Sequence, residues 1–358
     1  MRTAFGSTVA APLRPLLVAL FATLLAIASQ IVGLGAPDAH ANSKYAGLVM
    51  DAKTGKVLYS ANANSRRYPA SLTKMMTLYL IFEDLKAGKI SMKTRVPMTR
   101  EGARRPPSKL GLRVGQSVSV NQAILALVTK SANDVASAVG GKLSGSEAAF
   151  ARRMTRKARQ LGMNRTTFKN ASGLTARGQV TTAKDMATLG LALREHFPRR
   201  YKVFQTRLFK FGKRRYGNHN KLLGRVRGVD GIKTGYTRAS GFNLVSSVQH
   251  KGRSIIAVVM GGRTGARRNA HMKDLIRRYL PKASRNARQR RLVAKATGAR
   301  GSYALRGSVQ MLAKMDDLPK PDFAPRTDRA MEKLAAKATA STVKAVAPVA
   351  SDTGGRSA

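Results

Sequence analysis

The chain has 358 residues and no cysteine, and its 66 lysines and arginines exceed its 17 aspartates and glutamates by 49 charges. The lack of cysteine excludes disulfides and a thiol nucleophile, and the length fits one large domain with attachments or two modest domains. So large a positive charge predicts attraction to something polyanionic, such as nucleic acid, an anionic membrane surface or an acidic envelope polymer.

Residues 1–41 have the organisation of a secretory signal peptide. Arg2 and Arg14 precede the apolar stretch LLVALFATLLAIASQIVGLG, and the small-x-small triplet AHA ends at Ala41. This order predicts cleavage between Ala41 and Asn42 and export to the periplasm or the outer face of the cytoplasmic membrane. An uncleaved membrane anchor is the alternative. Because export separates the protein from nucleic acid, we expect no nucleic-acid partner.

A hairpin and a buried helix are the first elements expected after the signal. Residues 46–60 read AGLVMDAKTGKVLYS, in which two apolar runs flank a Thr-Gly turn, as in an antiparallel hairpin. Residues 69–82 read PASLTKMMTLYLIF and are apolar on every side after Ser71, so this helix belongs in a core. Loops and short strands are expected over 90–118.

Helices are expected next, and strands follow them. Helical patterns occupy 120–143 and 144–163, with Ser144 and Glu147 forming a capping box at the start of the second. A third helix follows Thr182 as its N-cap. Strand patterns then cover 202–210 and 222–260, where the runs NLVSSVQ and SIIAVVM are joined across His250-Lys251-Gly252 as a hairpin. The segment NAHMKDLIRRYL closes the domain as a helix.

Strand patterns at both ends of residues 42–282, with helices between them, predict an α+β catalytic domain. We expect one antiparallel sheet built from both ends of this domain, flanking helices and an inserted all-helical lobe. A functional site is expected in the cleft between sheet and lobe. Residues 283–358 are basic and rich in alanine and lysine, and we expect a largely disordered tail there.

An amine stands at the start of the buried helix. Ser71 and Lys74 are three residues apart, so on a helix they share a face at about 5–6 Å between Cβ atoms, and the amine can reach the hydroxyl. Burying an ammonium group is costly unless it is paired or neutral. A neutral lysine can serve as the base that activates a serine nucleophile. The alternative is a lysine that extends to solvent from the helix end.

The tripeptide Ser131-Ala-Asn133 lies between two helical patterns of the expected lobe. Ser131 has the chemistry to relay a proton, and Asn133 can hold an amide group of a substrate. Helix capping is the alternative, because serine and asparagine both favour that position.

The tripeptide Lys233-Thr234-Gly235 enters a strand pattern after GVDGI. Its glycine permits close approach of a ligand backbone, and a strand edge can pair with a peptide. Lys233 would supply a second positive charge that keeps Lys74 neutral, and together with Thr234 it can bind a carboxylate. The same tripeptide at 53–55 lies in the expected hairpin turn, where it is ordinary turn sequence.

In this order the motifs S-x-x-K, S-x-N and K-T-G resemble those of the penicillin-binding proteins and serine β-lactamases. The resemblance extends over roughly residues 42 to 280, and phrases such as YPASLTKMMTLYL, SANDVA, GVDGIKTGYT and VVMGGRT are similar to the exported D-alanyl-D-alanine carboxypeptidases. It implies the β-lactamase/transpeptidase-like fold. It also implies a serine enzyme that removes the terminal D-alanine from peptidoglycan stem pentapeptides and is acylated by β-lactam antibiotics.

The resemblance implies a role for each site residue. Ser71 is the nucleophile, Lys74 is its base, and Ser131 passes the proton to the departing D-alanine. The backbone N–H groups of Ser71 and Tyr236 form the oxyanion hole. A further set binds the substrate: Asn133, Lys233, Thr234, Gly235, Tyr236 and Arg268. Among them, Lys233, Thr234 and Arg268 hold the terminal carboxylate of the substrate.

Other functions are compatible with parts of this pattern. A β-lactamase of the first class carries a deacylating glutamate in an E-x-x-L-N loop, and no glutamate of this chain has that setting. A peptidoglycan D,D-endopeptidase uses the same motifs. A polyanion-binding envelope protein whose enzymatic activity has decayed would account for the positive charge but not for the intact motifs. In an active enzyme, the basic tail could instead attach the protein to an anionic envelope surface. The scattered histidines have no metal-ligand spacing, so we expect no metal and no cofactor.

Overall fold

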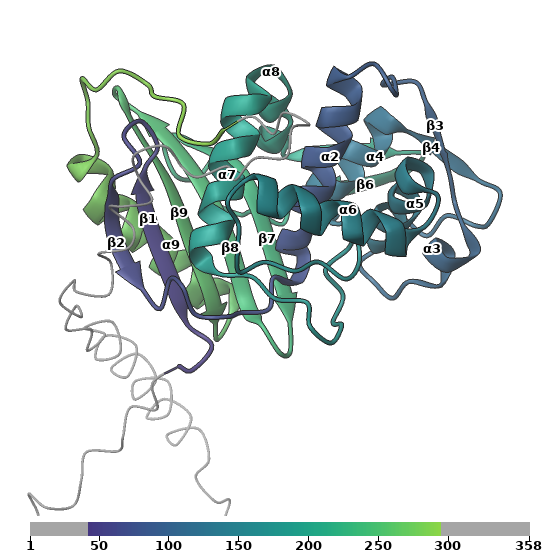
Figure 1. The fold of residues 1–358 in the computed structure, drawn as a ribbon, viewed down its shortest axis with the longest axis horizontal. Coiled ribbons are helices and arrows are strands. Elements are labelled where there is room, and N and C mark those ends of the chain that lie inside the picture. The colour runs from purple at the N-terminus through teal and green to yellow at the C-terminus, as the bar shows by residue number, and fades with distance from the viewer. Residues whose placement is uncertain (1–41, 295–358) are drawn as a thin grey trace, which may run out of the picture. The chain divides into compact units, whose positions relative to one another are not determined.

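The computed structural model describes residues 42–294 (Figure 1). Five antiparallel strands form its main sheet in the order β2-β1-β9-β8-β7. Their bounds are β1 Ala46–Asp51, β2 Val57–Ala61, β7 Val229–Thr237, β8 Gly241–His250 and β9 Arg253–Gly262. The two N-terminal strands therefore join the three C-terminal ones, which confirms the expected sheet. The β8–β9 hairpin across residues 251–252 is confirmed as well.

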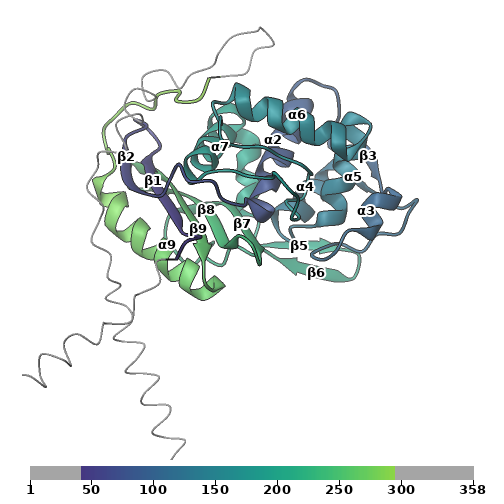
Figure 2. The same ribbon diagram turned by 60° about the horizontal axis from the view of Figure 1, so that its bottom comes forward.

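Helices cover both faces of this sheet (Figure 2). Along β9, Ile255, Ala257 and Val259 belong to the core shared with α9 (Gly265–Tyr279). The alternate side chains face α7 (Ala183–His196), and a Cβ on Gly190 of α7 would lie 3.3 Å from Ile256. Because successive strand residues point to opposite faces, an unbroken apolar run fits a strand that is buried on both sides.

A helical lobe is inserted between β2 and β7. Its helices are α2 Lys74–Lys86, α3 Arg100–Arg104, α4 Val120–Val128, α5 Asn133–Ser144 and α6 Glu147–Gln160. Two small two-stranded sheets accompany it, β3 Arg95–Pro97 with β4 Ser117–Ser119 and β5 Leu208–Phe211 with β6 Arg214–Gly217. Short helical turns complete the fold: η1 Ala70–Thr73, α8 Pro198–Tyr201, η2 Lys202–Gln205 and η3 Leu280–Lys282. Within residues 42–294, every helix is too short or too polar to cross a bilayer.

One expected helix cap is confirmed and another is wrong. Thr182 caps α7, with its hydroxyl oxygen accepting a hydrogen bond from the Asp185 N–H across 3.0 Å. Ser144, by contrast, is the last residue of α5. Gly145 follows it with φ +77°, a left-handed conformation that ends the helix, so α6 starts afresh with Ser146 as its N-cap.

The strand expected over 202–210 is only partly present. Residues 202–205 form the helical turn η2, and β5 begins at Leu208. Residues 222–228, expected to be extended, form turns instead. The reason is local, because the Asn220 side-chain oxygen accepts a hydrogen bond from the Leu222 N–H across 3.2 Å and closes a turn there.

The folded part of the chain extends beyond Lys282, the expected domain boundary. Residues 283–294, here named the C-terminal strap, lie against the domain through buried Leu292 and Val293. The carboxylate of Glu195 accepts hydrogen bonds from the backbone N–H groups of both. The strap was expected to be disordered because its few apolar residues show no periodicity. The expected signal peptide (1–41) and the remainder of the tail (295–358) lie outside the described residues.

Candidate active site

Ser71 lies in the tight turn that opens the buried helix. The preceding residue, Ala70, has φ +48°. A Cβ on Gly173 would lie 1.8 Å from the Ala70 carbonyl oxygen, so only glycine allows the two segments to approach this closely. The side-chain amide of Asn243, on β8, donates to the carbonyl oxygens of Tyr68 and Pro69. The serine is therefore positioned by contacts from both the sheet and the lobe.

Lys74 is fully buried beneath Ser71. Its amine nitrogen lies 3.2 Å from the Ser71 hydroxyl oxygen, 2.7 Å from the Asn133 side-chain oxygen and 2.6 Å from the Ser172 carbonyl oxygen. The Asn133 amide group is turned so that its NH2 donates to the Pro106 carbonyl across 2.9 Å. The alternative of a lysine extending to solvent is thereby excluded.

These contacts fix what the amine can do when it is neutral. The oxygens of Asn133 and Ser172 only accept hydrogen bonds, so each must receive an N–H from Lys74. A neutral amine has two N–H groups and one lone pair, and both N–H groups are used by these two oxygens. The lone pair is left for the Ser71 hydroxyl, which can then donate its proton to the amine.

The electrostatic surroundings favour the neutral amine. Burial lowers the pKa of Lys74 well below its usual value, and the neighbouring Lys233 cation lowers it further, while Asp134 and Glu147 oppose the shift. Burial also lowers the pKa of Lys233 to about 7, with a contribution from Arg268. The positive charge of Arg268 therefore disfavours protonation of Lys233, and that of Lys233 disfavours protonation of Lys74.

Ser131 and Asn133 begin the second wall of the site. Ser131 adopts φ +59°, and within residues 42–294 its buried hydroxyl has no hydrogen-bond partner. Asn133 is the first residue of α5, but its side chain makes no cap and instead binds Lys74 and Pro106. A buried unpaired hydroxyl is costly, so its presence in the lining of the cleft that also holds Ser71 points to a functional role.

Strand β7 forms the opposite wall and is an edge strand of the sheet. A Cβ on Gly235 would lie 3.0 Å from the Ser71 backbone nitrogen, so this glycine permits the strand to pass directly alongside the serine. Lys233 is buried and donates to the Thr234 carbonyl across 2.8 Å. Tyr236 is 55% exposed, and its ring stacks on Phe242 at 4.2 Å between centroids.

Arg268 reaches the site from α9. Its guanidinium donates to the Asn243 carbonyl across 2.6 Å and to the Asn269 side-chain oxygen across 2.9 Å. Burial lowers the pKa of Arg268 to about 10, so it remains cationic at neutral pH. A cationic guanidinium that lines the cleft suits an anionic ligand group.

A cleft of about 390 Å³ joins these walls. Seven of the nine residues expected from the sequence line it, namely Ser71, Ser131, Asn133, Thr234, Gly235, Tyr236 and Arg268. The other two, Lys74 and Lys233, lie buried beneath its surface. The second Lys-Thr-Gly tripeptide, 53–55, lies in the β1–β2 turn as expected.

Sequence reasoning missed His219, which also lines the cleft. Burial and the cations Lys233 and Lys130 lower its pKa to about 4, so the imidazole is neutral at neutral pH. It follows β6 without any motif around it. The one available signal was its position shortly before the Lys-Thr-Gly strand.

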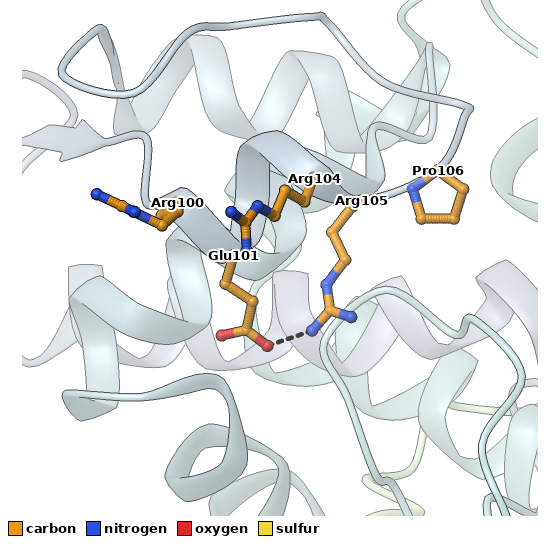
Figure 3. Close-up of a pocket in the computed structure, with 5 residues that line it drawn as sticks. All are labelled: Arg100, Glu101, Arg104, Arg105 and Pro106. Carbon is orange, nitrogen blue, oxygen red and sulfur yellow. Dashed lines mark hydrogen bonds and ion pairs between the residues drawn. The ribbon is translucent and has the colours of Figure 1, made fainter.

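A second pocket of about 430 Å³ is lined by residues of α3 and by Arg105 and Pro106, which follow it (Figure 3). In it, Arg105 extends from the end of α3 to Glu101. The same guanidinium lies 2.6 Å from buried Glu147, whose other oxygen accepts from the Ala171 N–H across 2.9 Å. Ala171 directly precedes Ser172, so Glu147 holds the segment that carries an acceptor of the Lys74 amine. Within residues 42–294, no group of three or more His, Asp or Glu side chains is arranged to hold a metal ion.

The chain is similar to several known proteins. The family model described as D-alanyl-D-alanine carboxypeptidase matches residues 33–264. The D-alanyl-D-alanine carboxypeptidase DacC of Escherichia coli is 38% identical over 252 residues, which are 68% of this chain and 62% of that relative's length. The chain thus spans less than two thirds of that relative.

Solved structures agree. Penicillin binding protein 5 of Haemophilus influenzae aligns with a TM-score of 0.63 and 33% identity, over 68% of this chain and 72% of its own. Penicillin-Binding Protein D2 of Listeria monocytogenes, solved in its ampicillin-bound form, aligns with a TM-score of 0.60 and 29% identity, over 68% of this chain and 98% of its own. With the family model covering more than half of its residues, the chain belongs to the D-alanyl-D-alanine carboxypeptidase family.

Proposed function

We propose that this protein is a serine D-Ala-D-Ala carboxypeptidase that removes the terminal D-alanine from peptidoglycan stem pentapeptides. The observation that carries the proposal is the buried Lys74 amine, whose nitrogen lies within hydrogen-bond distance of the Ser71 hydroxyl oxygen and of two carbonyl oxygens. A neutral amine that donates to both carbonyl oxygens keeps its lone pair for the Ser71 hydroxyl. Membership of the family supports the same reaction. β-Lactams, which present a reactive amide to the same serine, are expected to acylate it.

Acylation begins with attack by the Ser71 hydroxyl oxygen on the carbonyl carbon between the two D-alanines. The hydroxyl proton moves to the Lys74 nitrogen as the new C–O bond forms. The C–N bond then breaks, and the proton reaches the departing amine through the otherwise unpaired Ser131 hydroxyl. The products of this half-reaction are free D-alanine and an ester on Ser71.

Hydrolysis restores the enzyme. A water molecule adds to the ester carbonyl carbon and gives one proton to the neutral Lys74 amine. The C–O bond to Ser71 then breaks, and the Ser71 oxygen takes that proton from Lys74. No deacylating glutamate is needed on this route. Glu147, a buried glutamate near the cleft, is already engaged by Arg105 and Ala171, which agrees with slow rather than rapid hydrolysis of β-lactam esters.

The substrate is held by the opposite wall. Its extended backbone pairs with the free edge of β7, where Gly235 leaves room beside the serine. The backbone N–H groups of Ser71 and Tyr236 donate hydrogen bonds to the oxyanion. In comparable sites each such donor stabilises the transition state by about 3 kcal/mol. Thr234, with the Lys233 and Arg268 cations, binds the terminal carboxylate, and Asn133 supports a substrate amide.

This reaction takes place on a polymer outside the cytoplasm, so the proposal includes export. The leader expected over 1–41 and cleavage after Ala41 would deliver the enzyme to the periplasm or the outer face of the cytoplasmic membrane. Attachment to an anionic envelope surface through the basic tail belongs to the same proposal.

The test is to incubate the purified protein with a labelled penicillin and, separately, with a pentapeptide ending in D-Ala-D-Ala. Mass spectrometry should find the penicilloyl adduct on Ser71 and release of one D-alanine per peptide. Ser71→Ala should abolish both, and Lys74→Ala should slow acylation by about 100-fold or more. An adduct on another residue, or no free D-alanine, would overturn the proposal, and cleavage of crosslinked dimers alone would indicate an endopeptidase.

A further inference from the structure

The β5–β6 hairpin carries an unusual concentration of positive charge. Residues 207–216 include five basic residues, and no aspartate or glutamate occurs between Glu195 and Asp230. Lys210, Lys213 and both arginines at 214 and 215 are exposed, and within residues 42–294 none of them forms an ion pair. We name these four cations and Arg207 the basic hairpin.

The strand register places like charges side by side. Lys210 is directly opposite Arg215, and Phe209 is directly opposite Tyr216. Residues that face each other across an antiparallel pair share a face, so the aromatic pair and the cationic pair point in opposite directions. Like charges directly opposite each other destabilise a hairpin. The opposed cations Lys210 and Arg215 are exposed to solvent, where an anionic partner would neutralise the repulsion between them.

The aromatic side attaches the hairpin to the catalytic lobe. Phe209 is buried, and the Lys130 amine lies over the Tyr216 ring at 5.3 Å from its centroid. Lys130 directly precedes Ser131, a residue of the cleft wall, and His219 enters the cleft shortly after β6 ends. Figure 2 shows the hairpin beside β7, next to the lobe. The hairpin is therefore joined through Lys130 and His219 to the cleft wall, while its opposed cations Lys210 and Arg215 point away from the aromatic side.

We propose that the basic hairpin binds carboxylate groups of the polymeric substrate, from peptides neighbouring the one in the cleft. The inference rests on the proposed function and names the form of substrate that the site prefers. Every uncleaved stem peptide ends in a carboxylate, so a strand that bears many of them is a polyanion. Lysine and arginine bind carboxylates well, and several weak contacts add up on a polymer. The turn of the hairpin, Gly212-Lys213, offers no apolar side chain for insertion into a bilayer, which favours the polymer over a lipid surface.

The test compares two double variants of equal charge change. Lys210→Gln with Arg215→Gln removes the opposed pair, and Lys56→Gln with Arg288→Gln removes two exposed cations from the β1–β2 turn and the strap. Each protein is sedimented with insoluble purified peptidoglycan and, separately, with vesicles of anionic phospholipid, over a range of salt concentrations. Each is also assayed for D-alanine release from a short soluble peptide.

We expect the hairpin variant to bind the polymer about 5- to 10-fold more weakly at low salt, with a shallower salt dependence, while the control variant matches the wild type. Turnover of the short peptide should be unchanged in both. Equal retention of both variants would overturn the inference, as would a loss of binding confined to vesicles of anionic phospholipid. Failure of the wild type to cleave the short peptide would instead refute the proposed function, so the two failures are distinguishable.

Discussion

The side-chain oxygen of Asn133 accepts a hydrogen bond from the Lys74 amine across 2.7 Å. Replacing this amide by a carboxylate of the same shape, Asn133→Asp, would place a negative charge at that distance. A nearby negative charge favours the ammonium form, so the pKa of Lys74 should rise. We expect the acidic limb of the pH profile for penicillin acylation to move upward by about one pH unit or more. An unmoved limb with a reduced rate would show that Asn133 acts on the substrate alone.

Lys233 acts on the same amine with the opposite sign. Its cation lowers the pKa of Lys74, so Lys233→Gln should raise that pKa and keep the amine protonated to higher pH. The acidic limb for acylation should therefore move upward, in addition to any loss of carboxylate binding. In the wild type, the pKa of Lys233 near 7 adds a decline in carboxylate binding as the pH rises above neutrality. Rapid-quench acylation measured from acidic to alkaline pH separates the two effects.

Glu147 provides the complementary experiment. Its carboxylate raises the pKa of Lys74, so Glu147→Gln should lower that pKa and move the acidic limb downward, opposite to the shift for Lys233→Gln. The substitution also weakens the contacts with Arg105 and the Ala171 N–H, and we expect a loss of about 1–3 kcal/mol in unfolding free energy. A limb that moves in the same direction in both variants would contradict this electrostatic account.

The sequence was most informative where the chemistry is local. Ser71 and Lys74 share one helical turn, so their spacing alone predicts contact. The two Lys-Thr-Gly tripeptides were separated correctly because turn and strand patterns differ around them. The effect of Lys233 on Lys74 was also expected from the residue types, although the two residues meet only through the fold.

What the sequence did not reveal depends on contacts between distant segments. The Ser172 carbonyl is a backbone group, and no residue type announces that it will accept from Lys74. Gly173 is required by the Ala70 carbonyl, about a hundred residues earlier in the chain. The strap was missed because Glu195 binds it through backbone N–H groups, which leave no pattern in the sequence.

Gly235 should tolerate no side chain. In Gly235→Ala the new methyl would lie 3.0 Å from the Ser71 nitrogen and 3.1 Å from the Leu72 nitrogen, so strand or serine must shift. We expect acylation by penicillin to fall at least about 100-fold, because a displacement near 1 Å can cost that much. Gly217→Ala is the matched control, since its methyl would meet nothing within 4 Å. Equal acylation rates in the two variants would mean that β7 is less tightly placed against the serine than the structure indicates.

The strap should contribute to stability although it lies outside the expected domain. Leu292 is 4% exposed. Replacing a buried leucine by alanine lowers the free energy of unfolding by about 2–5 kcal/mol, and we expect a value near the lower limit because the strap is a peripheral segment. For Leu292→Ala we therefore expect Tm to fall by about 4–8 °C. Arg288→Ala, at an exposed position of the same strap, should leave Tm within about 1 °C. Because the strap is bound to Glu195 on α7 rather than to any residue that lines the cleft, penicillin acylation below the transition should be the same in both variants. A stable Leu292→Ala protein would show that residues 283–294 add no free energy to the fold.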